Sequence, residues 1–342
     1  MQLYNKKVTA IVTALSQISH GVIPPKDKKD EKGENNVLRF RKMPMLLKNA
    51  NGNLVPTDVY TVSGNAMRGL GRRHMFHHTF EDVLDLDFDK ILDGYDAFSK
   101  RYVVNLFENG GSTPKDSKAA GGVPAETYLD ILAKNPFLDL LGGVYITHHF
   151  NSCMSVGNLV LRTKETQRFY VEDSKLFHDD ATGLPSIGEI EAKTERYTKT
   201  RSNIDASAYP EDKSASKAEQ DNLKSRAIYG AEVLPVGTSF YWESTLRNTT
   251  NEGTALAFDA FLALIARYGF IGGMSGKGYG HVSIQFDGLD VDDAIQKYDD
   301  YLIAHKDDIT KSIRMIADDF KYNLSKGDKA EKKSKKVEKN AE

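Results

Sequence analysis

The residues best suited to chemistry lie in two glycine-rich segments that are far apart in the sequence. Residues 63–73 read SGNAMRGLGRR, and residues 272–280 read GGMSGKGYG. Glycine lets a backbone come close to another polymer, and the neighbouring cations, hydroxyls and amides donate hydrogen bonds to phosphate oxygens. Neither segment matches a fingerprint that cradles a mononucleotide. The two segments therefore predict contacts to the phosphates of a polymer, made without reading its base sequence.

The first segment predicts a helix with one basic face. Ser63 is a typical N-cap residue, and Arg68 and Arg72 are four residues apart, so they share a helix face, with Arg73 beside them. We expect Ser63, Asn65 and these arginines to bind phosphates next to the positive end of the helix dipole. The alternative is a solvated basic face with local ion pairs.

Other candidate phosphate contacts are polar or cationic residues outside that helix: Ser19, His20, Arg39, Arg41, Ser275 and Lys277. Ser275 and Lys277 belong to the second glycine segment, whose glycines could also serve only to make a turn. His20 lies just after the first expected strand. Its imidazole could contact a phosphate, act as a general base or have a structural role.

Histidine pairs raise the question of a metal site. His77 is followed by His78, and His148 is followed by His149. Adjacent side chains point in different directions on a helix or a strand, and no cysteine or carboxylate pattern completes a set of ligands. We expect no metal site and no cofactor.

Composition limits the class of protein. The chain has 342 residues, a net charge of −2, 40% hydrophobic residues and one cysteine, Cys153. It can form a large core but no internal disulfide, which favours a reducing compartment. No apolar run is long enough to cross a membrane, and the first residues do not resemble a signal peptide. We expect a cytoplasmic protein that makes no membrane contact.

The expected elements give an α+β fold. Hydrophobic periodicity predicts strands and helices, in the order strand, helix, strand, strand, helix, strand, at 6–16, 64–79, 142–163, 227–243, 254–268 and 281–286. This is the ferredoxin-like βαββαβ plan. Further helices are expected at 88–108, 126–141 and 291–322. Charged stretches interrupt or follow the plan at 24–36, 186–226 and 325–342. We expect a core over 1–286, C-terminal helices over 287–324 and a disordered basic tail over 325–342.

Three segments resemble motifs of the RAMP superfamily of CRISPR-associated proteins, and they follow one another along the chain in the order that this family has. Residues 63–73 are similar to its Gly-x-x-Leu/Met-Arg-Gly-x-x-Arg element, and residues 272–280 to its glycine-rich loop before the last core strand. Residues 231–240, AEVLPVGTSF, resemble its Glu-x-(apolar)-x-Pro-x-Gly-Thr-x-Phe strand pair. Residues 15–21, LSQISHG, look most like the type IV branch of the backbone subunits, with type I-D next.

The resemblance implies an RRM-like palm, a thumb over 186–226 and helical fingers within 80–141. It also implies an antiviral ribonucleoprotein in which copies of the chain polymerise head to tail along CRISPR RNA. The bases stay free to pair with a target strand of DNA or RNA, and other effector subunits bind. In the thumb, Arg201 and Asn203 join the RNA-binding residues.

A catalytic residue would distinguish a ribonuclease from a subunit that only binds RNA. Type III backbone subunits cut target RNA with an aspartate after the first strand, where this chain has Asp27 and Asp30 in a lysine-rich stretch. The flanking residues depart from the type III motif, and a mobile carboxylate is poorly placed for in-line chemistry. We expect no enzyme activity. The alternatives are a type III-like ribonuclease, an RNA-processing endonuclease that uses His20, and a general single-strand binder.

Overall fold

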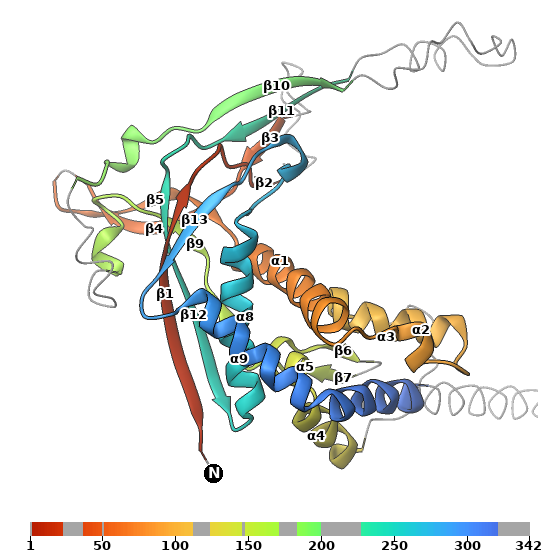
Figure 1. Cartoon of the computed structure of the whole chain (residues 1–342). Helices are drawn as coiled ribbons and strands as arrows, with labels where there is room; N and C mark the ends of the chain where they lie inside the picture. The colour runs from red at the N-terminus through yellow and green to blue at the C-terminus, as the bar shows by residue number, and fades with distance from the viewer. Residues whose placement is uncertain are drawn as a thin grey trace, which may run out of the picture.

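A computed structural model gives the fold of the chain (Figure 1). The structure describes residues 2–22, 37–49, 51–111, 124–145, 148–170, 183–199 and 227–320. The predicted contacts Arg201 and Asn203, the carboxylates Asp27 and Asp30, and the tail 325–342 lie outside these ranges.

The main sheet has seven strands, and four of them form the predicted core. Its order is β13–β1–β12–β9–β5–β4, with β8 also paired to β12. The strands are β1 (Tyr4–Ala14), β4 (Lys42–Lys48), β5 (Leu54–Val62), β8 (Met154–Val156), β9 (Leu159–Leu161), β12 (Ser239–Thr249) and β13 (Val282–Phe286). Neighbours in β13–β1–β12–β9 are antiparallel, and the helices α1 (Gly64–Phe76) and α8 (Glu252–Tyr268) lie in sequence between β1 and β9 and between β12 and β13. The predicted α+β class with a βαββαβ core is confirmed.

One face of this sheet is covered by helices. Val8, Ala10 and Val12 alternate along β1 and belong to the main hydrophobic core, together with Phe258 and Phe261 of α8. Helix α1 packs closely on α8, because a Cβ added at Gly71 would lie 2.3 Å from the Phe261 ring. Only glycine leaves room for that approach.

A second sheet of four strands has the order β10–β11–β3–β2. Its strands are β2 (Gly21–Val22), β3 (Val37–Phe40), β10 (Lys193–Lys199) and β11 (Ala227–Val233). Residues 227–243 form a strand, a turn and the start of a second strand, and the two strands lie in different sheets: β11 pairs with β10 and β3, whereas β12 pairs with β1, β8 and β9. The turn at residues 235–237 therefore connects two sheets, and the insertion expected at 186–226 contains the paired strand β10.

The other helices differ in their bounds from those that the sequence predicts. α1 passes into a π-helix, η1 (His77–Val83). The expected helix 88–108 is split into α2 (Phe88–Ile91) and α3 (Ala97–Asn109), with Gly94 at a φ of 83° between them. The expected helix 126–141 is split into α4 (Ala125–Lys134) and α5 (Pro136–Leu141), because Pro136 cannot donate the hydrogen bond that would continue α4. The strands β6 (Gly143–Tyr145) and β7 (His148–Phe150) pair with each other. The described part of the chain also contains the 3-10 turns η2 (Gln167–Phe169), η4 (Ile187–Glu189) and η6 (Ser275–Lys277).

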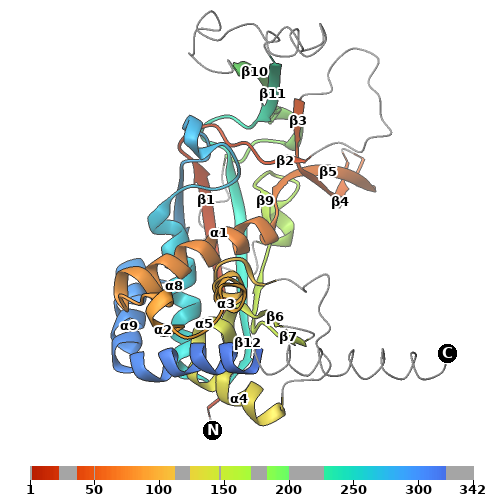
Figure 2. The same ribbon diagram turned by 90° about the vertical axis from the view of Figure 1, so that its right-hand side faces the viewer.

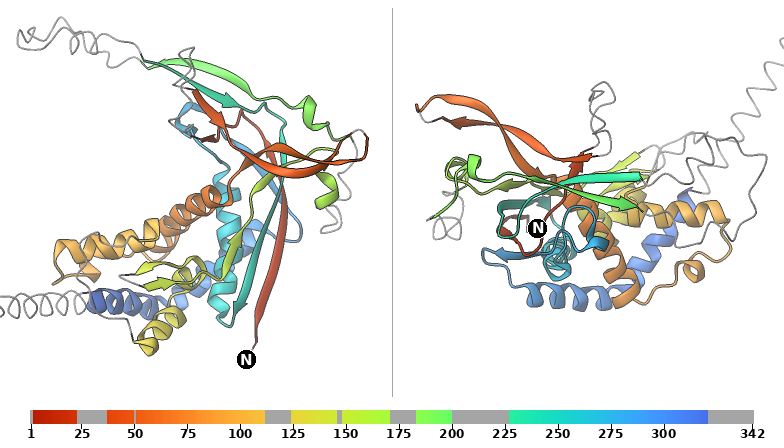
Figure 3. Two further views of the ribbon diagram at one scale, coloured as in Figure 1. Left: turned by 180° about the vertical axis from the view of Figure 1, so that it is seen from behind. Right: turned by 90° about the horizontal axis from the view of Figure 1, so that it is seen from above.

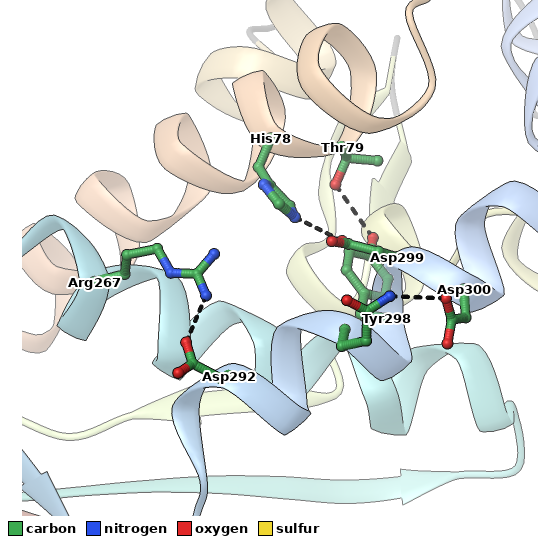
Figure 4. A network of polar contacts seen from close by, with 8 residues as sticks. His78, Thr79, Arg267, Asp292, Tyr298, Asp299 and Asp300 are labelled. Atoms are coloured by element: carbon green, nitrogen blue, oxygen red, sulfur yellow. Dashed lines mark hydrogen bonds and ion pairs between the residues drawn. The ribbon is translucent and has the colours of Figure 1, made fainter.

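The C-terminal helices pack against the core. Helix α9 (Val291–Ala304) lies along α8, and residues 306–320 are also helical. Figure 4 shows the polar contacts that hold α9: His78 Nε2 lies 2.7 Å from Asp299 Oδ1, and Arg267 donates to Asp292 over 2.8 Å. The buried Tyr298 hydroxyl lies 3.4 Å from Thr79 Oγ1. None of the described helices is both long enough and apolar enough to span a bilayer.

Candidate nucleic-acid interface

The second glycine segment is fixed at its base to the end of β1. Gly273 donates its backbone N–H to the Ser19 carbonyl over 2.7 Å, and Gly280 donates to the Gln17 carbonyl over 2.8 Å. Gly272 has a φ of +77°, and a Cβ there would lie 2.4 Å from the Ser19 oxygen. These glycines let the chain approach its own backbone rather than another polymer.

The apex of the same loop is open to solvent. Ser275 and Lys277 are exposed on η6, and a Cβ added at the intervening Gly276 would touch nothing within 4 Å. Below the apex, the Tyr279 hydroxyl donates to one oxygen of Glu195, and Gln17 donates to the other over 2.6 Å. The loop is therefore anchored at its base and presents a hydroxyl and a cation at its tip.

The residues after β1 connect this loop to the first glycine segment. The Ser63 backbone N–H donates to His20 Nε2 over 3.2 Å, and the Arg41 N–H donates to the His20 carbonyl over 2.9 Å. Burial, and then the charge of Arg41, lower the pKa of the His20 imidazole, so its neutral form accepts the bond from Ser63. Residues 17–20 thus contact the glycine loop on one side and the start of α1 on the other.

Ser19 offers almost no surface to a nucleic acid. Its residue is only 1% exposed, and its carbonyl accepts the bond from Gly273. The pairing of residues 17–20 with the glycine loop covers Ser19, so burial counts against the predicted contact.

The N-terminus of α1 is capped from within the protein. Ser63 Oγ accepts from the Ala66 N–H over 3.3 Å, which confirms Ser63 as the N-cap. The Gly64 N–H donates to Asn158 Oδ1 over 2.8 Å, and a Cβ at Gly64 would lie 2.1 Å from the Val156 carbonyl. Since these two helix N–H groups already have partners, the helix end offers a phosphate less than the sequence predicted.

Arg72 is bound within the protein, although it also borders the cavity beside α1, and its contact with phosphate stays a prediction. The residue is 6% exposed, and its guanidinium donates to four carbonyls: Leu106 and Phe107 at 3.1 Å, Leu141 at 2.8 Å and Gly142 at 2.5 Å. These carbonyls belong to the ends of α3 and α5, where unpaired C=O groups and the negative end of the helix dipole favour a cation. Burial, and then the charge of Arg68, lower the pKa of Arg72 to about 9.

Arg68, Arg73 and Asn65 line a cavity of about 320 Å³ beside α1. Arg73 is exposed, whereas Arg68 is partly buried, donates to the Leu141 carbonyl and has a pKa lowered by burial. Within the described ranges no carboxylate forms an ion pair with Arg68, Arg72 or Arg73. Glu108 also borders the cavity, so three arginines face one carboxylate there, and the net positive charge would stabilise an anion.

Arg39 and Arg41 lie in different surroundings. Arg39 forms an ion pair of 2.9 Å with Glu232, whose other oxygen accepts from the Phe40 N–H over 2.8 Å. Part of its charge is thereby neutralised. Arg41 lies next to His20, at the junction between the two glycine segments.

Several residues that position the interface carry no signal in the sequence. Asn158 and Glu195 act from strands or turns distant in the chain, and Gly143 borders the arginine cavity from β6. The sequence places Asn158 in the strand segment expected at 142–163 and gives no sign of its bond to Gly64. Among the described residues, no group of three histidine, cysteine or acidic side chains could hold a metal ion.

Comparisons with known proteins add little. No family model matches the chain, and no curated protein does. One solved structure that resembles it is a chain of a "Type IV-B CRISPR Complex", with 17% sequence identity and a TM-score of 0.47, covering 83% of this chain and 91% of that chain. This likeness is too weak to carry an argument about function.

Proposed function

We propose that this chain is an RNA-binding backbone subunit of a CRISPR effector ribonucleoprotein, most like the type IV branch and next like type I-D. Several copies would stack head to tail along the CRISPR RNA, with other effector subunits and a target strand as further partners. The observation that carries the proposal is that residues 17–20 join the two basic glycine segments at one end of the sheet.

The geometry supports binding through phosphates. Ser275 and Lys277 are exposed at the loop tip, and Asn65, Arg68 and Arg73 line a positive cavity beside α1. Such donors bind the sugar–phosphate strand and do not read base edges, so sequence recognition would come from pairing between guide and target. Affinity should therefore fall steeply with salt and depend little on RNA sequence.

We propose that the chain does not cut RNA, because the residues around Asp27 and Asp30 depart from the motif of the type III ribonucleases. Cleavage of a complementary RNA at regular spacing by the purified complex would contradict this part of the proposal. Loss of that cleavage in a variant with both aspartates replaced by alanine would then favour the ribonuclease.

The test combines charge reversals with a salt titration. Arg73→Glu and Lys277→Glu change two exposed cations, and Lys311→Glu makes the same change on the exposed surface of helix 306–320. We expect each of the first two to weaken guide RNA binding about tenfold or more and to reduce the slope of log affinity against log salt by roughly 0.7 per lost contact. Lys311→Glu should leave both unchanged.

Equal affinity and equal salt slope for wild-type protein and the Arg73→Glu/Lys277→Glu double variant would show that the RNA binds elsewhere. RNA that copurifies with the protein should have uniform ends, as a processed guide does. RNA of random length and sequence would favour a general single-strand binder.

A further inference from the structure

A second cavity lies at the end of the molecule opposite the glycine loop. Its volume is about 610 Å³, and it is bordered by α4, by the turn between β12 and α8, and by α9. Leu129 and Leu132 of α4 form an apolar side, and Leu129 is 62% exposed. Asp139 and Glu252 supply carboxylates to the same cavity.

The carboxylate of Asp139 is held in place by neutral donors. Thr249 and Thr254 donate to its Oδ2 over 3.0 and 2.7 Å, and the Cys153 thiol lies 3.4 Å from its Oδ1. Burial, and then the charge of Asp139, raise the pKa of Cys153 to about 12, so the thiol stays protonated as a donor. Among the described residues, neither Asp139 nor Glu252 has a lysine or arginine partner. The cavity thus combines an apolar side with negative charge that no cation compensates.

The hairpin β4–β5 carries the complementary surface. Leu46 lies opposite Pro56, and Lys48 lies opposite Leu54, so these four residues share one face of the hairpin near its tip. Leu46 is 56% exposed and Leu54 is 57% exposed, whereas Leu47 on the other face is buried. Lys48 is exposed and has no acidic partner within the described ranges. The hairpin extends away from the body in both views of Figure 3.

The hairpin and the cavity lie far apart on the molecule. Figures 1 and 2 both place β4 and β5 in the upper half and α4 at the lower end. A copy therefore cannot fill its own cavity. A contact between two different surfaces of identical chains is heterologous, and such contacts build open helical assemblies.

We propose that the β4–β5 hairpin of one copy docks in the cavity beside α4 of the next copy. Leu46 and Leu54 pack on Leu129 and Leu132, and Lys48 pairs with the Asp139 and Glu252 carboxylates. The opposite charges and the paired apolar surfaces favour this occupant. The inference rests on the proposed head-to-tail stacking and names the surfaces that make it.

A charge swap tests the contact. Glu252→Lys and Lys48→Glu each place like charges together, and the double variant restores opposite charges with the order reversed. We expect each single variant to weaken filling of a long RNA about tenfold or more, and the double variant to recover most of that loss. Asp307→Lys, an exposed acid on helix 306–320, is the matched control and should have no effect.

Two further measurements separate this inference from RNA binding itself. Affinity for a short RNA that accommodates one copy should be the same in all four variants, since no second copy is present. In a Cys153→Ser background, Leu54→Cys and Leu129→Cys together should give a ladder of covalent oligomers with a short bismaleimide, with or without RNA. A variant with only one of the two cysteines should give no ladder.

Three results would overturn the contact. The first is unchanged assembly in both single reversals. The second is a loss of short-RNA affinity in Lys48→Glu, which would show that the hairpin binds RNA and not a second copy. The third is a missing ladder in the two-cysteine variant. A ladder from a protein that binds no RNA would retain the contact and reject the proposed function.

Discussion

Replacing Arg72 by methionine tests whether this arginine stabilises the fold instead of binding RNA. Methionine keeps an unbranched side chain of similar length but removes every guanidinium donor. The four carbonyls of Leu106, Phe107, Leu141 and Gly142 would then lose their bonds to Arg72. Two helix ends, those of α3 and α5, would also lose the cation that their dipoles favour.

The magnitude follows from what the substitution leaves behind. The Leu106 and Leu141 carbonyls keep donors in the Gly110 N–H and in Arg68, so two carbonyls lose their donor. At about 1–3 kcal/mol each, they set an upper limit near 6 kcal/mol. The substitution also removes the cost of burying a charge, and water from the neighbouring cavity can reach some of the carbonyls. We therefore expect a net loss of about 2–5 kcal/mol, below the upper limit. Against a total stability of about 5–15 kcal/mol, this is a large fraction.

Equilibrium unfolding in urea measures the effect, with Arg73→Met as the matched control. Arg73 is the next residue and is exposed, so its replacement should change the free energy of unfolding by no more than about 0.5 kcal/mol. RNA affinity should show the reverse order, with the larger loss in Arg73→Met. Equal stability of the two variants would refute the reasoning, because it would mean that the Arg72 carbonyl contacts contribute nothing net.

Two other predictions concern His20 and the glycines of α1. The pKa of His20, followed by NMR, should lie below its usual 6.5, and Arg41→Ala should raise it. The stability that neutral His20 contributes is complete above pH 6.5 and is lost as pH falls through the lowered pKa. A pKa above 6.5 would contradict the bond from Ser63. Gly69→Ala should stabilise the protein by about 0.5–1 kcal/mol, since a Cβ there meets only Arg73 at 3.9 Å. Gly71→Ala should destabilise it by about 1–3 kcal/mol, because its Cβ would collide with the Phe261 ring. Urea midpoints that move in the same direction for both variants would disprove this distinction.

The order of strands and helices could be predicted from the sequence, because periodicity and caps are local signals. The alternation of Val8, Ala10 and Val12 marks β1, and Ser63 marks the start of α1. Strand pairing is a long-range property, so the partners of β11 could not be predicted: its bonds to β10 and β3 depend on segments far away in the chain.

The arginines show the same limit at the level of the site. The spacing of Arg68 and Arg72 places them on one helix face but does not say what covers that face. The ends of α3 and α5 cover Arg72 and leave Arg73 exposed. The glycines were likewise informative about close approach, but Gly64 and Gly272 approach the protein's own carbonyls.

Glu195 connects two parts of the molecule mechanically. It belongs to β10 and holds both Gln17 and Tyr279, the residues at the base of the glycine loop. Any displacement of β10 along its axis pulls on this base before it reaches the loop tip. An RNA strand bound at Lys277 would therefore resist a shift of β10, so a force on β10 would be transmitted to the glycine loop.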